Sequence, residues 1–143
     1  MNGTTTFEEL LAGVTADAGR FGHREHVRLT WLAVRRLGMP AAVDFVGEGI
    51  RRTAAGAGAP GKFHVTMTRA WVELVAHHVL LDREAGFSDY AAFDDSAEFA
   101  ERHPELLDRA LLTRFYRADT LAGEAARTGW VEPDLAPLPH LTD

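Results

Sequence analysis

Apolar residues recur at helical spacing along most of this chain, and no window shows the sustained alternation of apolar and polar residues that marks a half-buried strand. Thr6 and Glu9 have the spacing of a capping box at the start of the first stripe. We expect helices over 7–18, about 23–37, from about 41, about 62–83, after Ser88, about 105–116 and after Asp119 or Thr120. These segments predict an all-α fold, a small single-domain helical bundle with short connections.

Glycine and proline divide the helical segments and end them. Gly38 and Pro40 separate the second from the third, and Pro104 suits the first turn of a later one. Beyond residue 129, three prolines exclude regular structure, so we expect an extended tail that wraps the body. A length of 143 residues suits one domain, with a core bundle over about 6–118 and a C-terminal tail over about 129–143.

Composition excludes several classes of function. A net charge of −6 argues against nucleic-acid binding, which depends on clustered lysine and arginine. The chain has no cysteine, and this removes thiol nucleophiles and cysteine-based metal sites. No apolar stretch approaches the length of about 20 residues that spans a bilayer, and residues 1–6 lack the pattern of a signal peptide. We therefore expect a cytoplasmic protein without membrane or nucleic-acid partners, able to form a homodimer.

The seven histidines are the informative feature of this composition. Helical geometry places His23 and His26 on the core face of the second helix, and His64 on that of the fourth. If the second, third and fourth helices run up, down and up, the second and fourth begin at the same end of the bundle. We therefore predict that these three histidines gather at one end, under the loop of residues 56–61.

Such a cluster favours a mononuclear metal site. Imidazoles three residues apart on a helix can meet one divalent ion such as Zn, Fe or Cu, and three ligands leave a position for water or substrate. We predict His23, His26 and His64 as ligands in an enzyme acting on a small, possibly anionic, molecule. His64 and the only lysine, Lys62, would serve catalysis and contact the anion, with Thr68 beside them. A lyase, a hydrolase and an oxidative enzyme all fit.

Two alternatives use the same residues. In a metal-free dehydratase or isomerase, His64 acts as a general base. In a helical ligand-binding, haem-binding or regulatory module, the histidines are structural or coordinate haem. The remaining histidines have simpler interpretations: His77 at the surface, His78 packed at the far end of its helix, His103 helping to cap the helix at Pro104, and His140 in the tail.

Two segments resemble a group of small bacterial proteins of unassigned function. They are Phe21-Gly-His-Arg-Glu-His26 and Lys62-Phe-His-Val-Thr-Met-Thr-Arg-Ala-Trp71. The likeness extends to the 106–116 stretch and to Trp130-Val-Glu-Pro-Asp134, and it implies no activity. An acidic residue is common in the group where this chain has Val65, so no carboxylate role carries over there.

Overall fold

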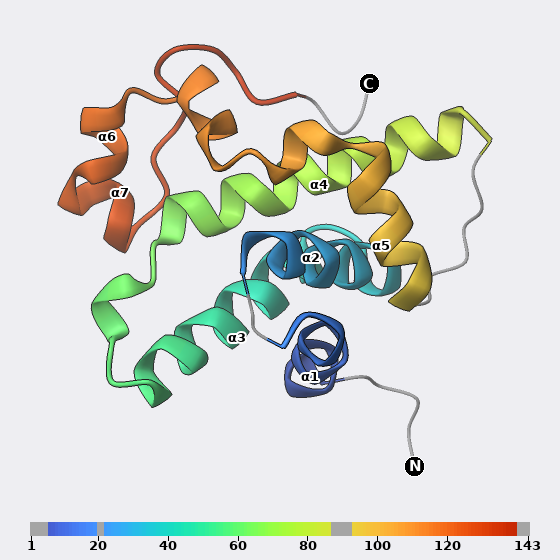
Figure 1. Ribbon diagram of the computed structural model, residues 1–143. Helices are drawn as coiled ribbons and strands as arrows, with labels where there is room; N and C mark the ends of the chain where they lie inside the picture. Colours follow the sequence, from blue (N-terminus) through green and yellow to red (C-terminus); the bar gives the residue numbers. More distant parts are fainter. Residues whose placement is uncertain (1–5, 20–21, 87–92, 140–143) are drawn as a thin grey trace.

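The computed structural model describes residues 6–19, 22–86 and 93–139 and confirms the all-α fold, with no strand among them (Figure 1). The longer helices are α1 (Phe7–Ala18), α2 (His23–Leu37), α3 (Ala41–Gly56), α4 (Val65–Glu84) and α5 (Phe93–Arg102). The shorter ones are η1 (Pro60–Lys62), η2 (Pro104–Leu107), η3 (Arg109–Arg114), α6 (Ala118–Ala122) and α7 (Glu124–Thr128), where η denotes a 3₁₀ helix.

Local signals account for the bounds of the first helices. The Thr6 hydroxyl accepts from the Glu9 N–H at 3.1 Å, and the Glu9 carboxylate accepts from the Thr6 N–H at 2.8 Å, which confirms the capping box. Gly19 ends α1 with a φ of 75°, a left-handed conformation that favours glycine. Gly49 of α3 is buried against Phe7, where a Cβ atom would lie 2.2 Å from the ring, so glycine here permits close approach of α1 and α3.

Two predicted helices differ in the structure. α4 begins at Val65 rather than near residue 62, because η1 occupies the preceding residues. The helix expected over about 105–116 is two 3₁₀ segments, η2 and η3, which meet at Asp108. Asp108 has an extended backbone and its carboxylate accepts from the Ala110 N–H at 2.9 Å, a local bond that competes with a continuous helix. The expected cap at Ser88 lies outside the described residues.

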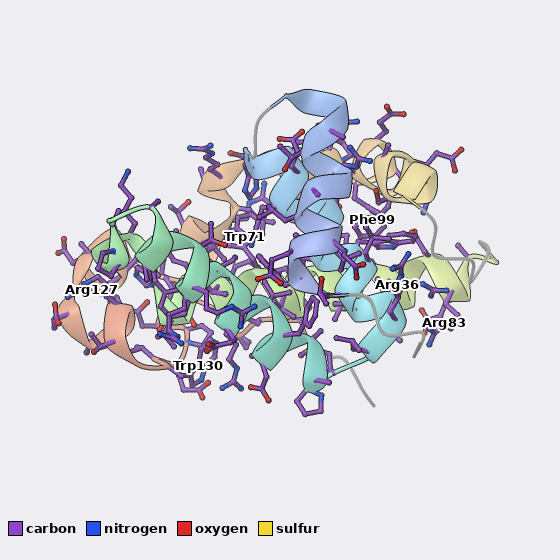
Figure 2. All side chains as sticks on the ribbon, turned by 90° about the horizontal axis from the view of Figure 1, so that it is seen from below. Arg36, Trp71, Arg83, Phe99, Arg127 and Trp130 are labelled. Atoms are coloured by element: carbon purple, nitrogen blue, oxygen red, sulfur yellow. The ribbon has the colours of Figure 1, made fainter. Side chains whose placement is uncertain are left out.

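α4 is the central element of the bundle. It packs against α2, α3 and α7, and its buried residues include Trp71, Leu74 and Val75. Figure 1 shows α6 and α7 beside the beginning of α4, with α5 on the opposite side of the molecule. In Figure 2, Arg127 of α7 and Arg83 in the last turn of α4 mark opposite ends of the molecule, and Trp71 lies in the interior between them.

The tail over residues 129–139 has no regular structure and runs back along the body. The Thr66 hydroxyl donates to the Gly129 carbonyl at 2.7 Å and accepts from the Val131 N–H at 3.1 Å. Tyr116, fully buried, donates its hydroxyl to the Val131 carbonyl at 2.7 Å. The tail is therefore fixed to α4 by side-chain bonds to its backbone.

Candidate functional sites on α4

His64 is the N-cap residue of α4. Its Nδ1 accepts from the Met67 N–H at 3.0 Å, so the ring proton is on Nε2, which donates to the Leu121 carbonyl at 2.7 Å. Both ring nitrogens thus have partners within the fold. As a metal ligand, this side chain would have to give up one of these bonds.

His23 and His26 lie together at the start of α2. Their ring centroids are 6.2 Å apart, and the His23 ring meets Trp71 edge-on at 4.6 Å. The Nε2–H of His23 donates to the Leu106 carbonyl at 2.8 Å, which leaves Nδ1 as the acceptor nitrogen. Burial lowers the pKa of His26 to about 4, and burial also lowers that of His23, so both imidazoles are neutral at pH 7.

The structure brings His23 and His26 together but gives His64 other partners. His23 contacts Trp71, which lies seven residues further along α4 than His64, or roughly 10 Å at the rise of a helix. Among the described residues, the set whose ligand atoms all lie within 4.8 Å of one another does not include these three histidines. The site of His23, His26 and His64 therefore stays a prediction.

Lys62 and Thr68 do not line the hollow that contains the histidine pair. Lys62 is exposed at the end of η1. Thr68 is buried, and it lines a hollow of about 450 Å³ together with Phe63, Arg51 and Trp130. His23 and His26 line a different hollow of about 310 Å³.

A second group of chemically active side chains lies in the C-terminal half of α4 and on the chain after α5. The Nε2 of His78 is 2.9 Å from Oε2 of Glu105, and Nδ1 of His103 is 3.8 Å from the same oxygen. The two imidazole rings meet edge-on at 4.9 Å. One ligand atom from each of the three residues lies within 4.8 Å of the other two, so this set can hold a metal ion.

Hydrogen bonds fix the orientation of both imidazoles. The Nδ1 of His78 lies 2.8 Å from the Leu74 carbonyl, which can only accept, so Nδ1 carries a proton. The Nε2 of His103 lies 2.7 Å from a carboxylate oxygen of Asp82, so Nε2 donates there. The remaining nitrogens, Nε2 of His78 and Nδ1 of His103, are the ones that approach Glu105.

The two carboxylates of this group are ionised at neutral pH. Burial by itself raises the pKa of Asp82, but hydrogen bonds from Arg102, at 2.6 Å, and His103 outweigh burial and hold the pKa below its usual value. Burial likewise raises the pKa of Glu105, while a backbone N–H and His78 lower it further than burial raises it. Both side chains therefore offer only acceptor oxygens.

The sequence places His78 far from His103 and Glu105 and gives no sign that the three residues converge. His78 was expected to pack at the far end of its helix, and His103 to assist a cap. One local signal exists: His103 and Glu105 flank Pro104, so the sequence itself places these two side chains near one another. His78, 25 residues earlier, joins them only through the packing of α4 against the segment after α5.

No family model matches the chain, and searches of the curated proteins and of the solved structures found no match. The candidate sites are therefore defined by the geometry of the chain's own residues. In the part that the structure describes, no helix is long and apolar enough to cross a membrane.

Proposed function

We propose that this protein binds one divalent transition-metal ion through His78 Nε2, His103 Nδ1 and the Glu105 carboxylate. The observation that supports the proposal is the second partner of each imidazole. The Leu74 carbonyl and the Asp82 carboxylate each take an N–H, so an acceptor nitrogen of each ring approaches the same carboxylate oxygen. Histidine ligands of metals characteristically have such outer partners, which set the tautomer and aim the lone pair.

The contact between His78 and Glu105 requires a positive charge. Because Nδ1 of His78 donates its proton to the Leu74 carbonyl, Nε2 of the neutral ring is an acceptor. The Glu105 oxygen 2.9 Å away is also an acceptor, so a proton or a metal ion must lie between the two atoms. A proton on Nε2 satisfies this contact as an ion pair, and a metal ion satisfies it as a shared ligand. The second nitrogen, Nδ1 of His103, lies 3.8 Å from the same oxygen, beyond hydrogen-bond distance, so its lone pair makes no hydrogen bond to Glu105 and can serve as a metal ligand.

The separations are close to those of a metal site. Ligand atoms bound about 2.1 Å from one ion lie roughly 3.0–3.4 Å apart. The observed 2.9 and 3.8 Å, from Glu105 Oε2 to the two imidazole nitrogens, fall on either side of this range, and all three ligand atoms lie within 4.8 Å of one another. Binding therefore needs a local adjustment of the side chains. Glu105 can move most readily, since its side chain is 43% exposed whereas those of His78 and His103 are 10% and 14% exposed.

The proposed ligands suit the same ions that the sequence predicts, although they are His78, His103 and Glu105 rather than the three histidines predicted from the sequence. Two imidazole nitrogens and one carboxylate oxygen suit Zn²⁺, Fe²⁺ or Cu²⁺. Three protein ligands leave at least one position for water or a small molecule, an arrangement typical of catalytic metal centres. Metal-dependent chemistry on a small molecule is therefore part of the proposal, and lyase, hydrolytic and oxidative reactions all remain compatible with it.

Calorimetric titration of the untagged chain with Zn²⁺ tests the proposal. We expect one ion per chain, and an affinity at least about 100-fold lower in H103A and in E105A, because each loses a ligand. H77A is the matched control, since His77 is the neighbour of His78 on the same helix. Circular dichroism of each variant separates loss of a ligand from loss of the fold.

The same titration can overturn the proposal. If the wild-type chain binds no Zn²⁺, Fe²⁺ or Cu²⁺, the group is an ion-pair network with a proton between His78 and Glu105. If H103A and E105A bind as tightly as H77A, the ion is held elsewhere, and H64A and H26A then test the site predicted from the sequence.

A further inference from the structure

A separate hollow lies at the start of α2, away from His78, His103 and Glu105. Its volume is about 310 Å³, and it is lined by Gly22, His23, His26, Met67, Trp71 and Arg109. The residues come from α2, α4 and the first position of η3, so the hollow exists only in the folded chain. It contains the histidine pair that the sequence singles out.

The walls combine apolar residues with one positively charged side chain. Trp71 and Met67 are the apolar lining residues. Arg109 is exposed and lies near enough to His23 for its charge to lower the pKa of that imidazole, while the charge of the neighbouring Asp108 raises it. The carboxylate of the adjacent Asp108 is bonded to the Ala110 N–H at 2.9 Å.

The two imidazoles of the hollow add polarity without charge. Burial lowers the pKa of both His23 and His26, so neither is cationic at pH 7. The Nε2–H of His23 is used by the Leu106 carbonyl, so the ring offers a ligand no further N–H. Arg109 is thus the only formal charge among the residues that line this hollow.

We propose that this hollow binds a small aromatic carboxylate, with the carboxylate on Arg109 and the ring against Trp71 and Met67. A guanidinium matches a carboxylate in a two-point, charge-assisted geometry. An indole edge favours an aromatic ring in an edge-to-face arrangement. The ligand class follows from the presence of both features in one hollow of suitable size.

The experiment is an ¹H–¹⁵N NMR titration of the full chain with benzoate, and with benzamide as a neutral ligand of the same shape. We expect benzoate to shift signals of the lining residues and to bind at least about tenfold more tightly than benzamide. R109Q should remove this preference. R114Q is the matched control, because Arg114 ends the same 3₁₀ helix and does not line the hollow.

Inorganic phosphate completes the design. If phosphate shifts the same signals with equal affinity, the hollow selects only for negative charge, and the aromatic part of the proposal is wrong. If benzoate and benzamide bind equally, if R109Q and R114Q weaken benzoate equally, or if no lining residue responds, the proposal is overturned. None of these results depends on a metal at His78 and His103.

Discussion

The two ends of α4 use inward-facing histidines in opposite ways. At its beginning, His64 caps the helix through one nitrogen and ties α6 to the body through the other. About four turns later, one nitrogen of His78 is bonded to the backbone and the other approaches a carboxylate. The same residue type on one helix therefore contacts backbone groups alone through its ring nitrogens at one end, and a backbone group and a carboxylate at the other.

The difference lies in the partner of the second nitrogen. A carbonyl, such as that of Leu121, is satisfied by the N–H of His64 and leaves nothing to bind. The Glu105 carboxylate faces one nitrogen from each of two imidazoles. Together these three side chains present more hydrogen-bond acceptors than donors to one another. We therefore take an inward-facing histidine as a candidate metal ligand when its second nitrogen faces a carboxylate, and as a structural residue when that nitrogen donates to a backbone carbonyl.

The largest expected effect contrasts the two histidine groups directly. Zn²⁺ at about 100 times its dissociation constant should stabilise the wild-type chain by about 2.7 kcal/mol. The double variant H78A/H103A should lose this gain, and H23A/H26A should keep it. The melting temperature with and without Zn²⁺ measures both. The opposite result, loss in H23A/H26A alone, would restore the site predicted from the sequence.

A smaller effect is expected from the residue that aims His103. D82N leaves an oxygen for the Nε2–H of His103 but removes its charge, so the affinity for Zn²⁺ should fall by about 10–100-fold. E84Q, which changes the charge of an exposed residue in the same helix, should have no effect. Calorimetry compares the two. Equal affinities would mean that Asp82 serves only its ion pair with Arg102.

His64 should affect stability and leave metal binding unchanged. H64A removes a helix cap and the bond to Leu121, and should lower the free energy of unfolding by about 1–2 kcal/mol. H64N should recover part of this loss, because asparagine is a good N-cap residue. Urea denaturation gives the energies. Loss of Zn²⁺ affinity in H64A with unchanged stability would contradict the structural role.

A last effect, spread over a range of pH, concerns the protonation of His26. Its pKa of about 4 in the folded chain lies below the ordinary value of 6.5, so the unfolded chain binds a proton first as the pH falls. Stability from the neutral ring is present above pH 6.5 and is lost toward pH 4, by less than about 1.4 kcal/mol per pH unit. H26Q should show a shallower loss over this window. An NMR titration of His26 near pH 6.5 would exclude the effect.

The sequence anticipates most of the fold for a local reason. Capping residues, glycine stops and helical periodicity act within a few residues, and they place α1 and α2 at the expected bounds. These signals do not predict the break at Asp108, where the carboxylate accepts from the Ala110 N–H and the helix expected over about 105–116 is divided in two. Likewise, the offset of α2 along α4 decides which histidines meet, and periodicity gives the face of a residue but not the register of its helix.

The sequence by itself determined an all-α chain, the inward faces of His23, His26 and His64, and a composition rich in imidazole and free of thiols. Only the tertiary structure decided the partners of each ring. η2 shows how: Glu105 approaches two histidines, while the carbonyl of its neighbour Leu106 accepts from His23. A hydrogen-bond partner depends on distances of about 3 Å between segments remote in sequence, and helix packing alone sets those distances.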